Sequence, residues 1–94
     1  MVKKISKNDI NNVLVRQLTR SATSIGVNYM EADGAESKKD FRHKIALCKK
    51  ESKESQHWLR MIETAVKSTS SDLRILRQEA KELSLIFSSI VNKC

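Results

Sequence analysis

The residues of this sequence best placed to do chemistry are cations that recur at helical spacing. At about 100° per residue, six of them fall within roughly 60° of one another on one helix. A row of positive charges can follow the phosphate backbone of a nucleic acid. The alternative is a solvated face of a basic helix, with Asp40 and Glu54 as local ion-pair partners. The row, called the basic stripe below, consists of Lys38, Arg42, Lys49, Lys53, Arg60 and Lys67.

Two further arginines, Arg16 and Arg20, lie one helical turn apart. They could extend a phosphate-binding surface, or they could pair with acidic residues of a neighbouring helix. We favour the structural pairing.

The sequence gives little support for a metal site or a catalytic site. Glu54 and His57 have the Glu-x-x-His spacing of di-metal bundles, but such a site needs two of these motifs and further glutamates. His43 and His57 would lie about 21 Å apart on one helix, too far to share a ligand. The sequence has no Gly-rich phosphate loop and no Ser–His–Asp or Cys–His arrangement. We therefore predict no metal, no cofactor, no small-molecule substrate and no enzymatic activity.

The cysteines and the tryptophan have plainer interpretations. Cys48 and Cys94 form no CxxC pair, which argues against a disulfide framework or a zinc site and suits a reducing cytosol. Cys48 falls on an apolar seam and is expected to be buried. Trp58 is expected in the core or at an interface, rather than as a platform for base stacking.

Size and composition favour a small helical protein. The chain has 94 residues, no proline, two glycines and 4% aromatic residues, which suits long helices and a single domain over residues 1–94. The net charge of +7 permits a polyanionic partner without requiring one. The N-terminus has no apolar signal-peptide region, and no apolar run approaches the ~20 residues that cross a bilayer. We therefore expect a cytoplasmic protein that does not bind a membrane.

Apolar periodicity predicts three helices, over about 10–33, 38–67 and 71–92. Ser37 and Asp40 mark the start of the second helix, and Gly34 is expected to end the first in a left-handed conformation. Gly26, inside the first helix, predicts a close approach by a neighbouring helix. The seam of the second helix has heptad spacing and consists of Phe41, Ile45, Cys48, Ser52, Ser55, Leu59, Ile62 and Val66. The apolar face of the first helix is expected to consist of Leu14, Leu18, Ser21, Ile25, Asn28 and Ala32. That of the third helix is expected to consist of Leu73, Leu76, Ala80, Leu83, Phe87, Ile90 and Cys94.

Both connections are short, so sequential helices should be antiparallel neighbours in an all-α, up-and-down helical bundle. Three helices with apolar faces this wide leave surface without a partner inside the chain. Either another chain or a further helix would cover it.

The motifs of the first two helices resemble those of the four-helix-bundle proteins encoded in intervening sequences of bacterial 23S rRNA genes. The resemblance covers roughly residues 3–92 and joins two long motifs across a capped turn. The residues that carry it are Arg16–Leu18, Arg20–Ala32, Ser37–Phe41, His43-Lys44, Lys50-Glu51, Glu54 and His57–Leu59.

The resemblance implies an up-down-up-down four-helix bundle that assembles into a homopentameric ring. It also implies similarity to the accessory protein of diversity-generating retroelements, a basic pentamer that engages a reverse transcriptase and nucleic acid. No enzymatic activity is attached to the family. Members carry a full helix before the motif at residues 16–32, whereas residues 1–5 resemble only the tail of that helix. We therefore expect three complete helices here, in a chain that is either a shortened copy or part of a longer reading frame.

The function expected on these grounds is an oligomeric module that associates with RNA or a ribonucleoprotein through the basic stripe. It has no recognised base-reading module, so its sequence specificity would be weak. The alternative is a structural or adaptor protein that assembles with itself and binds another protein without nucleic acid.

Overall fold

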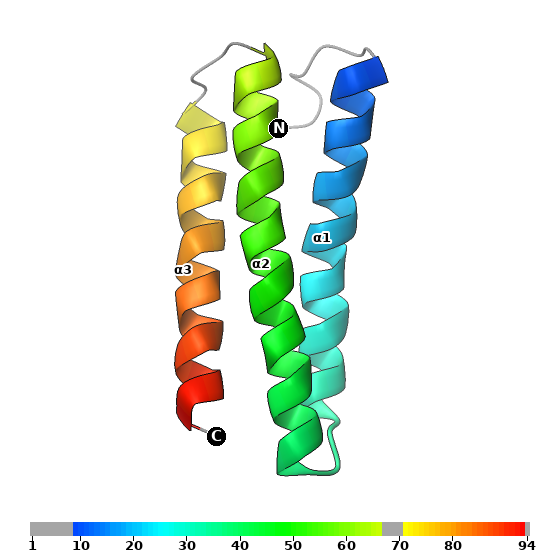
Figure 1. The fold of residues 1–94 in the computed structure, drawn as a ribbon, viewed down its shortest axis with the longest axis vertical. Coiled ribbons are helices and arrows are strands. Elements are labelled where there is room, and N and C mark those ends of the chain that lie inside the picture. Colours follow the sequence, from blue (N-terminus) through cyan, green and yellow to red (C-terminus); the bar gives the residue numbers. More distant parts are fainter. Residues whose placement is uncertain (1–8, 67–70, 94) are drawn as a thin grey trace.

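The computed structural model describes residues 9–66 and 71–93, and these form three α-helices (Figure 1). Helix α1 spans Asp9–Asp33, α2 spans Lys38–Val66 and α3 spans Ser71–Lys93. These bounds lie within one residue of the ranges expected from the sequence. The described residues contain no strand, which confirms the all-α prediction with three helices.

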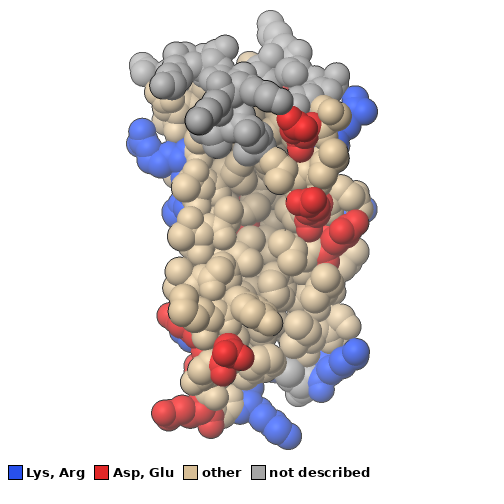
Figure 2. Space-filling view, turned by 180° about the vertical axis from the view of Figure 1, so that it is seen from behind, with Lys and Arg blue, Asp and Glu red and all other residues tan. Residues whose placement is uncertain are grey.

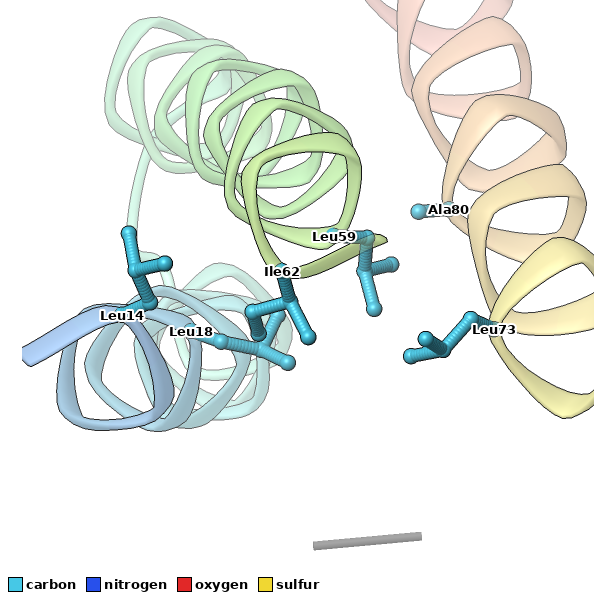
Figure 3. Packing of buried hydrophobic residues seen from close by; sticks show 6 residues of the cluster. All are labelled: Leu14, Leu18, Leu59, Ile62, Leu73 and Ala80. Atoms are coloured by element: carbon cyan, nitrogen blue, oxygen red, sulfur yellow. The ribbon is translucent and has the colours of Figure 1, made fainter. Parts of the chain in front are cut away.

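Helix α2 lies in the middle, with α1 and α3 on either side of it and neighbouring helices running in opposite directions (Figure 1). Helices α1 and α3 each pack along α2 and have little contact with each other. Seen along the axis, side chains from all three helices point into the space between α1 and α3 (Figure 3). The three helices therefore make a bundle that is open on one side.

In the turn between α1 and α2, the start of α2 agrees with the prediction from the sequence, whereas the end of α1 differs from it. The Asp40 N–H donates to the Ser37 Oγ at 3.0 Å, which is the predicted helix cap. Gly34 does not take the expected left-handed conformation. Its N–H instead donates to the Met30 carbonyl at 3.2 Å, and the Ala35 N–H then donates to Ala32 at 3.1 Å. The helix thus ends in a tightened last turn, which needs no positive φ.

Gly26 also departs from its prediction. A Cβ added at Gly26 would meet nothing within 4 Å, so no neighbouring helix of the described chain approaches it closely. Gly26 is exposed, so none of the described helices makes the close approach that was expected. Ser21, one of the small residues nearby, is fully buried, whereas Ala22 is exposed.

The core consists of two apolar clusters with buried serines between them. The seam predicted on α2 is confirmed for its described side chains, since Phe41 is half-buried and the others are buried; the Val66 side chain lies outside the described residues. Between the clusters, the Ser21 and Ser55 hydroxyls lie 2.8 Å apart, and Ser52 donates to the Cys48 carbonyl at 2.8 Å. The clusters are Leu14, Leu18, Leu59, Ile62, Leu73 and Ala80 (Figure 3), and Ala32, Ile45, Cys48 and Phe87.

An apolar groove of about 380 Å³ runs between α1 and α3 on the open side. This side faces the viewer in Figure 2, where uncharged side chains cover most of the surface and Lys and Arg lie at its margins. Leu83, expected on the core face of α3, is 39% exposed there. The groove is lined by Leu18, Thr19, Ala22, Thr23, Ile25, Ser55, Leu59, Leu76, Glu79, Ala80 and Leu83. As expected from the width of the apolar faces, the described helices leave apolar surface uncovered.

Candidate nucleic-acid interface

The basic stripe lies on a flank of α2, about 110° around the helix from its core face, and borders α3 at Lys38 and at Arg60. Lys38, Arg42, Lys53 and Arg60 are exposed and Lys49 is half-buried. From Lys38 to Arg60 the stripe extends about 33 Å at 1.5 Å per residue. Lys67, its expected last member, lies outside the described residues. The remaining five cations are thus presented to solvent along one helix.

No described cation of the stripe forms an ion pair with a described residue. The alternative interpretation needed Asp40 and Glu54 as local partners. The Glu54 carboxylate instead accepts from the Arg20 Nη2 at 2.6 Å, on the side of α2 that faces α1. The four ion pairs of the described chain are Arg20–Glu51, Arg20–Glu54, Lys44–Glu31 and Arg77–Glu63. The described cations of the stripe therefore take no part in these close ion pairs.

Arg20 joins α1 to α2, which confirms for this residue, but not for Arg16, the structural pairing favoured from the sequence. Besides its bond to Glu54, it donates through Nη1 to Glu51 at 3.0 Å. The hydrogen bond from Arg20 lowers the pKa of the Glu54 carboxyl. The same bond raises the pKa of the Arg20 guanidinium. Arg16 is exposed on α1 and does not share these contacts.

Both ends of the stripe lie beside α3. Lys38 and Lys93 share a hollow of about 450 Å³ at one end. At the other end, Arg60 lies at a larger hollow of about 530 Å³ that contains three further cations, Arg74, Arg77 and Lys81 of α3. We call this second hollow the basic groove; it is lined by Gln56, Arg60, Arg74, Ile75, Arg77, Gln78 and Lys81.

Sequence reasoning missed the three cations of α3. Their spacing, at positions 74, 77 and 81, places them on one side of a helix and was visible in the sequence. What the sequence did not indicate is that this side lies next to Arg60. Two contacts between the helices fix that register: Gln56 donates to the Ser84 Oγ at 3.3 Å, and Arg77 donates to Glu63 at 3.3 Å.

Glu63 is an acidic side chain next to the basic groove, where it pairs with Arg77. Its side chain is 17% exposed, against 37% for Arg77. One carboxylate oxygen accepts from Arg77, and the other is buried with no hydrogen-bond partner among the described residues. The pair holds one guanidinium of the groove in place. Arg60, Arg74 and Lys81 have no acidic partner among the described residues.

The remaining residues singled out from the sequence lie in the core or on its edge. Cys48 is buried, as predicted, and burial raises the pKa of its thiol. Trp58 is half-buried and packs against the first apolar cluster, with its ring 4.8 Å from that of His57. Within residues 9–66 and 71–93, no group of three His, Cys, Asp or Glu side chains could hold a metal ion. Nor is any described helix long and apolar enough to span a bilayer.

Comparison with known proteins bears out the resemblance drawn from the motifs. Residues 1–89 match the family described as 23S rRNA-intervening sequence protein. The chain belongs to this family. None of the curated proteins matches it.

A similar solved structure supports the assignment of the chain to this family. It is the crystal structure of a protein of unknown function from the S23 ribosomal protein family of Bacteroides thetaiotaomicron VPI-5482. The two share 32% sequence identity and a TM-score of 0.79, over 84% of this chain and 73% of the other. Neither description names an enzymatic activity.

Proposed function

We propose that this member of the 23S rRNA-intervening sequence protein family is a non-enzymatic, cytoplasmic module that associates with RNA through the basic stripe. The observation that carries the proposal is the absence of any ion pair between the described stripe cations and the described acidic residues. Surface charges paired at close range would contribute little to binding. Unpaired charges along about 33 Å of helix can displace counterions from a phosphate backbone.

The chemistry of the stripe supports backbone contacts rather than base reading. Lysine and arginine side chains without a base-reading module position a nucleic acid without specifying its sequence. The one tryptophan is half-buried against the core and so is poorly placed for stacking. We therefore expect binding that is strong at low salt and weakly dependent on RNA sequence.

The test is a matched charge reversal. The variant Arg42→Glu/Lys53→Glu/Arg60→Glu changes three exposed stripe cations and leaves half-buried Lys49 in place. Its control, Arg16→Glu/Lys39→Glu/Lys50→Glu, changes three exposed cations outside the stripe by the same total charge. Fluorescence anisotropy with a labelled single-stranded RNA should show at least about tenfold weaker binding for the stripe variant than for the control. Equal losses would mean that net charge alone matters, and the stripe proposal would be wrong.

The second candidate, a self-assembling adaptor, is favoured by the open apolar side. The groove between α1 and α3 is continuous with the core through Leu18, Leu59 and Ala80. Exposed apolar surface of this kind marks interaction sites. The fourth helix and the pentamer that the family resemblance implies would each cover it.

Light scattering coupled to size exclusion tests the assembly. We expect a mass several times that of the 10.7 kDa chain. A single species at the mass of one chain would contradict self-assembly. An assembled protein without affinity for RNA would favour the adaptor over the RNA-associated module.

A further inference from the structure

The basic groove differs from the rest of the stripe because cations of two helices meet there. On α2 the stripe is one row of cations, in which successive members are separated by one or two helical turns. At Arg60, three more cations stand opposite on α3, around one hollow of about 530 Å³. Arg77 is paired with Glu63, and the lining residue Gln78 donates to Glu82. The other three cations form no ion pair with a described residue. Like charges this close repel one another, so an anion bound between them would be stabilised.

We propose that the basic groove is a binding site for two consecutive phosphates of an RNA backbone, at the point where the strand passes from α2 onto α3. This inference rests on the proposed function and adds Arg74, Arg77 and Lys81 to the interface. Contact between the protein and the RNA backbone is strongest at this groove.

The side chains of the groove suit phosphates. Arginine presents a planar fork of N–H donors that matches two phosphate oxygens, and the groove holds three arginines. Glu63 binds Arg77 through one guanidinium nitrogen, Nη1. The guanidinium has five N–H donors in all, so this bond orients the group and leaves donors for a ligand. The bond to Glu63 thus orients the Arg77 guanidinium within the lining of the groove.

The shape of the groove favours a polymer over a free nucleotide. Arg60, Arg74, Gln78 and Lys81 are exposed, so the groove is open to solvent along its rim. Small-molecule sites usually enclose their ligand with apolar and aromatic side chains. Here the lining has no aromatic residue, and its one apolar member is Ile75, which is 57% exposed. The groove therefore offers no pocket for a nucleotide base, whereas an RNA backbone can run along it.

The test changes only the α3 side of the groove. Arg74→Glu/Lys81→Glu reverses two exposed cations, while Arg16→Glu/Lys50→Glu reverses two exposed cations elsewhere. Arg77 is left unchanged because it is paired with Glu63 and could affect folding. Circular dichroism should give the same helix content for both variants. Anisotropy with a labelled single-stranded RNA is measured from 50 to 200 mM salt, with inorganic diphosphate as a competitor.

We expect the groove variant to bind RNA at least about tenfold more weakly than the control at 50 mM salt. The magnitude of its slope of log K against log salt should fall by roughly 1 to 2, the contribution of two lost phosphate contacts. Millimolar diphosphate should displace little RNA, since a free anion makes none of the other contacts. Diphosphate that displaces RNA completely would show a site for small anions and overturn the assignment to a backbone.

Two other outcomes are distinguishable. If RNA binding by the groove variant equals that of the control, the groove is not part of the interface, although the stripe proposal can stand. If the unaltered protein does not bind RNA at 50 mM salt, both the proposed function and the groove assignment are wrong.

Discussion

Buried serines occupy the middle of this bundle, where larger side chains would hold the helices apart. Ser21 and Ser52 are fully buried, and Ser55 is 4% exposed. Their hydroxyls are satisfied locally: Ser21 donates to the Leu18 carbonyl at 3.1 Å and lies 2.8 Å from the Ser55 Oγ. A buried hydroxyl is tolerated only when it is hydrogen-bonded. The contact between Ser21 and Ser55 therefore joins α1 to α2 at close range.

Ser21→Leu should destabilise the protein by about 1–3 kcal/mol, because the added side chain has no space and the Ser55 hydroxyl loses its partner. Urea denaturation followed by circular dichroism measures the change. Thr23→Leu, at an exposed position nearby on α1, is the control and should cost less than about 0.5 kcal/mol. Equal effects of the two substitutions would mean that the serine contact does not control the packing.

Arg20 should make stability depend on pH in the acid range. Its hydrogen bond lowers the pKa of Glu54 from the ordinary value of 4.5. The pair therefore stabilises the folded state fully above pH 4.5, and that contribution is lost as the pH falls through the lowered pKa. Both side chains are more than a third exposed, so the effect should be small.

Thermal melts of Arg20→Gln and the unaltered protein at pH 7 and at about pH 3 measure this contribution. The variant should melt lower at pH 7, and the difference should shrink at pH 3. A difference that stays constant would contradict the role assigned to the Arg20–Glu54 pair.

At the scale of the elements, the helices and their buried faces followed from apolar periodicity. The seam of α2 was predictable because its heptad spacing places its members on one face, and the described ones are buried or half-buried there. The conformation of Gly34 was not, because a helix can satisfy its last carbonyls through a tightened turn as well as through a left-handed glycine. The open space beside Gly26 was not predictable either, since it depends on how the helices pack.

Gly26→Ala should stabilise the protein by about 0.5–1 kcal/mol, because alanine loses less backbone entropy in a helix and its Cβ meets nothing within 4 Å. Urea denaturation at several protein concentrations measures this. A loss of stability that grows with protein concentration would contradict the open space at Gly26 and show that another copy packs against it.

At the scale of the whole molecule, the basic stripe runs along the α2 flank beside α3, whereas the apolar groove lies between α1 and α3. The stripe was predictable as one face of a helix, and five of its six residues are described. The basic groove was not, because it joins Arg60 to residues of α3 through a register that only tertiary packing sets. The face that holds the apolar groove is mostly uncharged, with Lys and Arg at its margins (Figure 2).

The salt dependence of RNA binding tests the central claim most directly. If the stripe and the basic groove contact the phosphate backbone, the affinity for a single-stranded RNA should fall steeply between 50 and 200 mM salt. With six phosphate contacts the slope of log K against log salt would be about −4, at roughly −0.7 per contact on a single strand. An affinity that stays constant over this range would contradict a backbone-binding surface.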